Sequence, residues 1–180
     1  ETDLVQGQYL WVTEVLERDC QDTRLEELLA AYKTPVVLEA DGCSPLTLDK
    51  SLGLFCGEGQ WAGENCLIHL EADAPEAQTA DNALRTLQIL LADSANWDRK
   101  ARQFAANELV DNANDWQEDE DAPEITEAEF ASRISISEIS ISAEDGAFAL
   151  YYDDDDLFWG HVIIVSGDRT NGFSDATIAG

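Results

Sequence analysis

Residues 150–165 read Leu-Tyr-Tyr-Asp-Asp-Asp-Asp-Leu-Phe-Trp-Gly-His-Val-Ile-Ile-Val, and this stretch decides the fold of the chain. Two runs of β-branched and aromatic residues flank four consecutive aspartates, a pattern typical of two strands joined by an acidic hairpin tip. We therefore expect one strand to end near Tyr152 and a long second strand to run from Leu157 to Val165. The rest of the chain is consistent with a sheet built around this hairpin.

The sequence before this hairpin predicts further antiparallel strands. Residues 134–142 alternate isoleucine with serine, and a change of phase at Glu138 predicts a β-bulge. Asp145-Gly146 predicts the turn into the next strand. Earlier in the chain, short apolar runs separated by glycines predict a meander with strands at residues 46–49, 52–56, 60–61 and 66–71, and with turns at 57–59 and 63–65. Residues 167–180 are expected to form a turn-rich tail.

Residues 74–116 predict two helices. Apolar residues recur at helical spacing on both sides of a break near Asp93-Ser94, and Pro75 suits a first helical turn. We expect the two helices to pack as an antiparallel pair that covers one face of the sheet. The acidic stretch 117–123 is expected to be a solvated linker, and Thr126 with Glu129 predicts a capping box at the start of a short helix.

Residues 1–44 are expected to be an accessory segment, docked on a main domain at 45–180. Residues 4–16 fit a helix or a strand equally well. Asp22-Thr23 predicts the start of a helix whose apolar face holds Leu25, Leu28 and Leu29. The fold class predicted for the whole chain is α+β, with an N-terminal meander and C-terminal hairpins in an antiparallel sheet covered by the helix pair, and a helical or extended N-terminal segment.

The charge of the chain restricts its partners. Ten Lys and Arg against 38 Asp and Glu give a net charge of −28 at pH 7. Such a surface repels phosphate backbones and anionic lipid, so we expect neither nucleic-acid nor membrane binding. Three explanations of the acidity remain open: adaptation to salt, since only Lys33, Lys50 and Lys100 are lysines; a face matched to a basic partner; and a cation site.

Cysteine spacing argues against a metal site or a disulfide framework. Cys20, Cys43, Cys56 and Cys66 include no Cys-x-x-Cys pair, and Cys66 and His69 would point to opposite faces of a strand. We expect free thiols. No run of residues is long and apolar enough for a membrane span and no signal peptide is visible, so a cytoplasmic protein is expected, although a signal removed from the N-terminus stays open.

Recognisable catalytic motifs are absent. The sequence contains no nucleophile elbow, zinc-protease motif, P-loop or dinucleotide fingerprint. Asp153, Asp154, Asp155 and Asp156 lack the spacing of an EF-hand loop, so a solvated loop or a partner contact is favoured over a bound cation. His161 beside these aspartates could act as a general base, but no nucleophile accompanies it, and a structural role is favoured.

Several segments resemble the bacterial domain of unknown function 2262 family. They are residues 46–50, 61–63, 112–116, 125–130, the strand from 134, 145–148, 151–161 and 175–180, and the most specific is Leu157-Phe-Trp-Gly-His161. The resemblance spans residues 45–180. It implies an α+β domain whose Tyr-Asp turn and Trp-Gly-His segment are shared features, and it carries over no catalytic residues.

The function predicted from these observations is non-enzymatic binding of a basic protein. The concrete version is an immunity protein that neutralises a toxin, an analogy of type only. The contact residues are predicted to be Tyr152, Asp153, Asp154, Asp155, Asp156, Trp159 and His161, with no cofactor and no metal. Two alternatives stay open: a metal-dependent hydrolase that uses His161 and nearby aspartates, and a salt-adapted domain whose acidity has no binding role.

Overall fold

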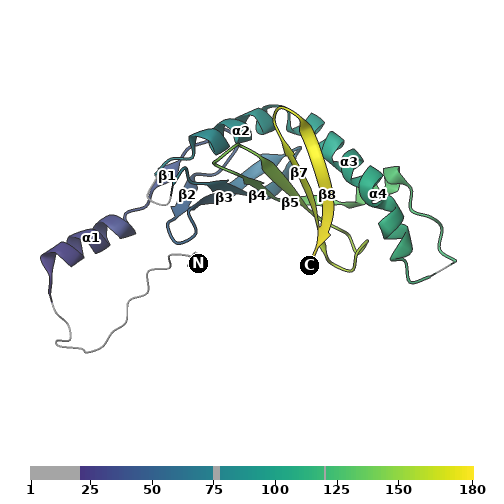
Figure 1. The fold of residues 1–180 in the computed structure, drawn as a ribbon, viewed down its shortest axis with the longest axis horizontal. Helices are drawn as coiled ribbons and strands as arrows, with labels where there is room; N and C mark the ends of the chain where they lie inside the picture. The colour runs from purple at the N-terminus through teal and green to yellow at the C-terminus, as the bar shows by residue number, and fades with distance from the viewer. Residues whose placement is uncertain (1–20, 75–77, 120) are drawn as a thin grey trace, which may run out of the picture. The chain divides into compact units, whose positions relative to one another are not determined.

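The computed structural model describes residues 21–74, 78–119 and 121–180, and the chain divides into two compact units, 1–34 and 35–180. The described helix of the first unit is α1 (Thr23–Lys33), shown in purple in Figure 1. The predicted start is confirmed, because the Asp22 side chain accepts a 3.1 Å hydrogen bond from the Leu25 N–H. The docking of this helix on the main domain stays a prediction, and the predictions for residues 4–16 and Pro75 lie outside the described residues.

The second unit is an α+β domain built on one sheet, as the sequence predicts. Its eight strands lie side by side in chain order, from β1 to β8. They are β1 (Val37–Leu38), β2 (Leu46–Asp49), β3 (Leu54–Trp61), β4 (Glu64–Glu71), β5 (Ser135–Ile141), β6 (Phe148–Asp153), β7 (Val162–Asp168) and β8 (Gly172–Ala179). All neighbours pair antiparallel except β4 and β5, which are parallel. The fully antiparallel sheet expected from the sequence is therefore corrected at this one pair.

Three helices occupy the connection between these two parallel strands. They are α2 (Asp81–Ala92), α3 (Ser94–Asp115) and α4 (Glu127–Arg133). Parallel neighbours need a long crossover, and the helices supply it. Figure 1 shows α2 and α3 following one another over the same face of the sheet. The antiparallel helix pair is not confirmed, because the single residue Asp93 separates the two helices and reversing the chain direction between helices takes a longer loop.

The core lies between these helices and the covered face of the sheet. The side chains that fill it alternate along the strands with side chains of the open face. Near the β7–β8 end, Trp97 of α3 stands edge-on to Phe148 and Phe173, each with ring centroids 5.6 Å apart. Such edge-to-face contacts add specific geometry to simple apolar burial.

The predicted meander is wrong at β3, which is one continuous strand. Residues 57–59 were expected to turn, but they lie inside one strand that continues to Trp61. A Cβ atom at Gly57 would lie 2.6 Å from the Leu46 side chain, and one at Gly59 would lie 3.0 Å from Ile68. Glycine occurs at these positions because neighbouring side chains cross the strand closely, not because the chain reverses. The true turn is the two-residue loop Ala62-Gly63, both with positive φ.

The C-terminal strands differ from the prediction in two places. β7 begins at Val162 and not at Leu157, because residues 154–161 form a loop. The tail predicted to be turn-rich contains β8, which pairs antiparallel with β7 along its whole length. The expected bulge near Glu138 is confirmed, since the β5–β6 register shifts between Ile136 and Glu138.

A buried polar network joins α3 to the sheet. One oxygen of Asp98 accepts hydrogen bonds from the Trp61 indole N–H at 2.9 Å and from the Tyr152 hydroxyl at 3.0 Å. The other oxygen accepts from the Arg102 guanidinium at 2.6 Å, and Arg102 also pairs with Glu64 at 2.8 Å. Burial, followed by the Asp98 charge, raises the pKa of Tyr152 well above its ordinary value. Every member of this network has a partner, so the buried charges are compensated.

Candidate functional site

The loop of residues 154–161, between β6 and β7, carries most of the predicted site, and Asp154 organises it. The Asp154 side chain is 4% exposed. Its Oδ2 accepts hydrogen bonds from the Phe158 N–H at 2.6 Å and from the Gly160 N–H at 3.2 Å. A carboxylate that accepts two backbone N–H groups fixes the path of the chain around it. The acidic run is therefore not a uniform tip, because one of its members supports the loop from inside.

Three non-glycine residues in this loop have a left-handed backbone: Asp155 at φ +47°, Asp156 at +58° and Trp159 at +58°. Each such conformation costs of order 1 kcal/mol and persists only where other interactions hold it. Arg133, at the end of α4, provides one of these interactions. Its Nε donates to Asp155 Oδ2 at 2.9 Å, and its NH2 group donates to the Asp155 carbonyl at 2.5 Å. These two bonds and those of Asp154 support the backbone of the loop that carries Trp159.

The held tryptophan belongs to an aromatic surface that we call the tryptophan patch, composed of Trp116, Trp159 and His161. The Trp116 ring lies 5.1 Å from the Trp159 ring and 5.4 Å from the His161 ring, centroid to centroid. On its inner side it stands edge-on to the buried Phe158, at 5.5 Å. Trp159 itself is 62% exposed. Large aromatic side chains that are rigid yet exposed are the usual anchors of protein interfaces.

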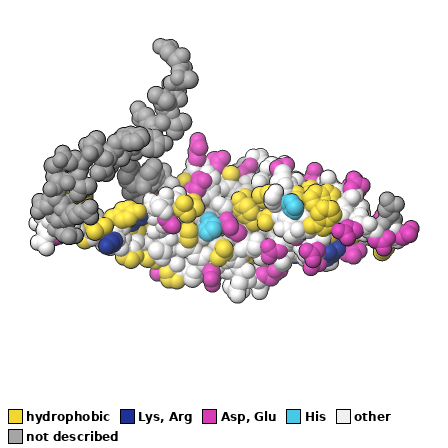
Figure 2. Space-filling view, turned by 90° about the horizontal axis from the view of Figure 1, so that it is seen from below, with side chains coloured by type: hydrophobic (Ala, Val, Ile, Leu, Met, Phe, Trp, Pro, Cys, Tyr) yellow, Lys and Arg dark blue, Asp and Glu magenta, His cyan; other side chains and the backbone are white. Residues whose placement is uncertain are grey.

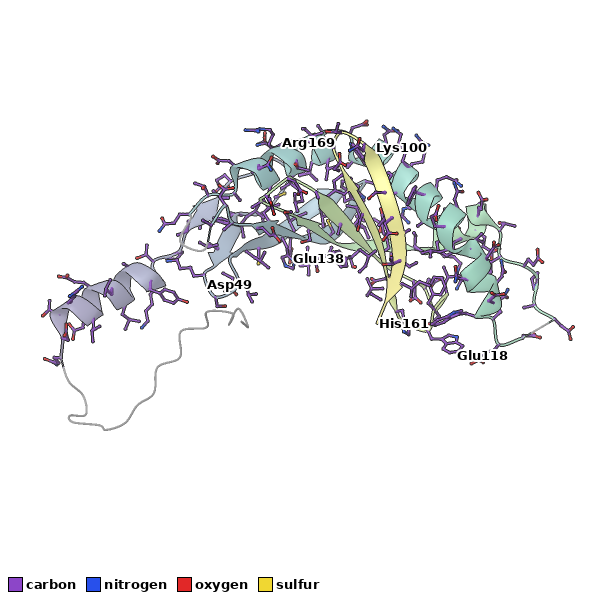
Figure 3. All side chains as sticks on the ribbon, in the orientation of Figure 1. Asp49, Lys100, Glu118, Glu138, His161 and Arg169 are labelled. Carbon is purple, nitrogen blue, oxygen red and sulfur yellow. The ribbon has the colours of Figure 1, made fainter. Side chains whose placement is uncertain are left out.

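Acidic side chains surround the patch. Figure 2 shows a histidine inside a hydrophobic area bordered by Asp and Glu side chains, with few Lys or Arg nearby. In Figure 3, His161 and Glu118 lie at the same end of the domain, whereas Lys100 and Arg169 lie at the other end of β7 and β8. Lys100 and Arg169 therefore lie away from the patch, whereas Arg133 lies beside Trp159 and is paired with Asp155.

The structure separates the predicted contact residues into two groups. Asp153, Asp155, Asp156 and Trp159 are exposed, and His161 is half-buried, so a partner could reach them. Tyr152 is fully buried and bonded to Asp98, and Asp154 is buried inside the loop. These last two residues are inaccessible in this structure. The alternation of the strand explains the difference for Tyr152, because it shares the core-facing side with Leu150.

The arrangement around His161 does not assemble the predicted hydrolase site. His161 Nδ1 lies 2.5 Å from the Phe158 carbonyl oxygen, which can only accept, so Nδ1 carries the proton. Within the described ranges, no hydrogen bond joins this ring to an aspartate. The described part of the chain also contains no group of three His, Cys, Asp or Glu side chains placed to hold a metal ion. The ring instead packs on Trp116.

The second histidine lies on the open face of the sheet. His69 Nδ1 is 2.7 Å from Glu138 Oε1, and this contact connects the parallel strands β4 and β5. Cys56 stands opposite His69 on β3. Burial and the charges of Asp49 and Glu138 raise the pKa of this thiol, so the protonated and weakly nucleophilic form is favoured. The cluster therefore has the composition of a Cys-His-acid site without an activated thiol.

Two parts of the site escaped the sequence reasoning. Trp116 is half-buried and joins the patch, and it is absent from the predicted contact residues. The acidic stretch 117–123 was expected to be a solvated linker, and most of its described residues are exposed. Residues 117–119 and 122–123 also form one side of a cleft of about 410 Å³ whose other side holds Asp156 and Trp159, and this cleft was not predicted. The hydrogen bonds between the Asn114 side chain and the Ile125 backbone bring the two ends of this stretch together, and no local sequence pattern predicts them.

Comparison with known proteins yields one match. No curated protein and no solved structure is significantly similar to this sequence. None of the helices among the described residues is long and apolar enough to cross a membrane. A family model described as an uncharacterized protein conserved in bacteria matches residues 41–178, which include β2 to β7, all of β8 but its last residue, and the 154–161 loop. The chain therefore belongs to the domain of unknown function 2262 family.

Proposed function

We propose that the domain is a non-enzymatic binding module that recognises a basic protein through the tryptophan patch and the carboxylates around it. The observation that carries the proposal is Trp159, a large side chain 62% exposed and held by a strained loop that Asp154 and Arg133 brace. Backbone strain maintained at an exposed aromatic residue costs stability, and a binding role accounts for that cost. The net charge of −28 would then accelerate association with a cationic partner.

The concrete version of the proposal is a toxin-neutralising immunity protein with a basic toxin as its partner. A small domain with a net charge of −28 fits this type. The support is chemical analogy, because neither the family description nor the geometry names a partner. This version requires that the partner inhibits growth when it is expressed alone and that co-expression of the full chain restores growth.

The test uses the tagged full chain as bait in an extract of its native cells at low salt. Four baits are compared: the unchanged chain, Trp159→Ala, Leu67→Ala as an exposed apolar control on the open sheet face, and Asp175→Asn as a distant charge control. We expect one basic protein to be retained by the unchanged chain and by both controls, and to be lost with Trp159→Ala. Its purified form should bind with a dissociation constant that rises with salt.

Two results would contradict this function. The first is retention of the same proteins by Trp159→Ala and by the unchanged chain. The second is the absence of any specifically retained protein, together with a stability of the chain that rises steeply with KCl, which would favour salt adaptation as the reason for the acidity.

A further inference from the structure

A cleft beside the tryptophan patch has a composition that selects one kind of side chain. We call it the acidic cleft; it lies between residues 117–119 and 122–123 on one side and the 154–161 loop on the other, and has a volume of about 410 Å³. Its floor is apolar and includes Ala113, Ile125 and Leu157. The Asn114 side chain holds Ile125 in place, since its Oδ1 accepts from the Ile125 N–H at 2.7 Å and its Nδ2 donates to the Ile125 carbonyl at 3.0 Å.

The rim of the acidic cleft carries unneutralised negative charge. Four carboxylates line it: Glu118, Asp119, Glu129 and Asp156. None of them forms a salt bridge within the described residues. The one cation in the lining, Arg133, already pairs with Asp155 at 2.9 Å. A cationic group that entered the cleft would therefore meet carboxylates that have no salt-bridge partner among the described residues, whereas an anion such as phosphate would be repelled.

Tryptophan rings complete the acidic cleft. Trp116 and Trp159 both line it, with ring centroids 5.1 Å apart and ring planes inclined by 49°. Rings at this inclination cannot stack fully on each other, so parts of their faces stay available. The face of an indole ring attracts cations more strongly than that of any other side chain.

Resting on the function proposed above, we infer that the acidic cleft binds the guanidinium group of an arginine side chain from the basic partner. Arginine fits better than lysine for two reasons. Its planar guanidinium stacks on an indole face, and its five N–H donors reach two carboxylates at once. Lysine presents a compact and strongly hydrated ammonium that gains less from either feature. The volume of the cleft leaves room for the backbone that carries the arginine.

The experiment titrates the full chain with a capped pentapeptide, Gly-Gly-Arg-Gly-Gly. The indole N–H signals of the tryptophans are followed by ¹⁵N NMR and assigned with single variants. The matched probe is the same peptide with citrulline, which keeps the shape of arginine and removes its charge. We expect saturable shifts of the Trp116 and Trp159 signals with the arginine peptide. The signals of the buried Trp61 and of Trp97 should stay in place, which shows that the fold is unchanged.

Variants then locate the interaction. Trp159→Ala and Asp156→Asn should each raise the dissociation constant of the arginine peptide by about fivefold or more. This is the effect of losing a desolvated cation–π contact or a charge-assisted hydrogen bond. Asp175→Asn changes the net charge by the same amount as Asp156→Asn but lies on β8, and it should leave the affinity within about twofold. A lysine peptide should bind more weakly than the arginine peptide.

Each other outcome overturns the inference. Equal binding of the citrulline peptide would show that the acidic cleft selects apolar shape and not charge. Equal effects of Asp156→Asn and Asp175→Asn would show attraction by the overall charge. If no saturable shifts occur but binding of the basic partner still depends on Trp159, the arginine assignment is refuted and the proposed function is kept. If that partner does not require Trp159 either, the proposed function fails together with it.

Discussion

Trp61 and Asp98 are 37 positions apart in the sequence, and the indole N–H of Trp61 donates a 2.9 Å hydrogen bond to the buried Asp98 carboxylate. This bond connects the end of β3 to α3. The same carboxylate accepts from Tyr152 on β6 and from Arg102 one turn further along the helix. Asp98 therefore connects the helix to two strands of the sheet, β3 and β6.

Replacing Asp98 with alanine should destabilise the domain strongly. The change removes one carboxylate partner of the half-buried Arg102, which keeps Glu64 and the Ile134 carbonyl, and it removes the acceptor of two buried donors, Trp61 and Tyr152. We expect a loss of about 3 kcal/mol or more in the free energy of unfolding, measured by urea denaturation. Asp111→Ala is the matched control, since Asp111 is exposed on the same helix, and it should change stability by less than about 0.5 kcal/mol. A loss below about 1 kcal/mol for Asp98→Ala would contradict the role assigned to the network.

Asp154→Ala should loosen the loop and leave most of the sheet intact. Without the carboxylate, the Phe158 and Gly160 N–H groups lose their acceptor, and the left-handed backbone at Trp159 loses a support. We expect a loss of about 1–3 kcal/mol of stability. In the NMR spectrum, the Trp159 indole signal should broaden or move.

The neighbouring aspartate provides the control for this prediction. Asp153 is exposed at the end of β6, and its replacement by alanine removes the same charge from the same region. It should leave both the stability and the Trp159 signal nearly unchanged. Equal effects of the two substitutions would show that charge, and not the two backbone hydrogen bonds of Asp154, determines the loop.

Local patterns predicted the parts of the fold that depend on local physics. The Ile-Ser alternation of β5 and the cap of α4 at Thr126 both rest on contacts between near neighbours, and both are confirmed. The misassigned residues 57–59 show the limit of this reasoning. Glycine has the same local signature in a turn and under a crossing side chain, and only the position of Leu46 distinguishes the two. The strand β8 had a signal in Asn171-Gly172, a strong hairpin dipeptide.

The candidate site was predicted less completely than the fold. The exposed Trp159 and the three exposed aspartates, Asp153, Asp155 and Asp156, came from one contiguous motif. The acidic cleft needed Trp116 and Glu118 from the end of α3, about forty positions away in the chain. Their approach depends on how the crossover helices pack on the sheet. Sequence periodicity reports which face of a helix is apolar, but it does not report which loop that face will meet.

Gly57→Ala tests the explanation given for β3. The added methyl group would lie 2.6 Å from Leu46 Cδ2, a contact closer than any stable packing allows. Either Leu46 or the strand must move, and we expect a loss of about 1–3 kcal/mol in unfolding experiments. Gln60→Ala, on the exposed side of the same strand, should have an effect below about 0.5 kcal/mol. An unchanged or increased stability of Gly57→Ala would show that the strand has room at this position.

The stability of the domain should fall at high pH in part because of the Cys66 thiol. Burial, with smaller contributions from Cys43 and Glu64, raises the pKa of the Cys66 thiol to about 12, whereas an unfolded cysteine titrates near about 8.5. Between these two values the unfolded chain releases the proton and the folded chain keeps it. The unfolded state then binds fewer protons, so the free energy of unfolding falls as pH rises through this range and is unaffected by Cys66 at lower pH. Tyr152, whose pKa is also raised, acts in the same direction.

In Cys66→Ala the decline in the free energy of unfolding between pH 9 and 11 should therefore be shallower than in the unchanged chain, but it should not vanish. Absolute stabilities differ between the two proteins because the substitution also removes buried volume, so the slopes against pH are the quantity to compare. Identical slopes would show that the Cys66 thiol ionises as readily in the folded protein as in the unfolded one.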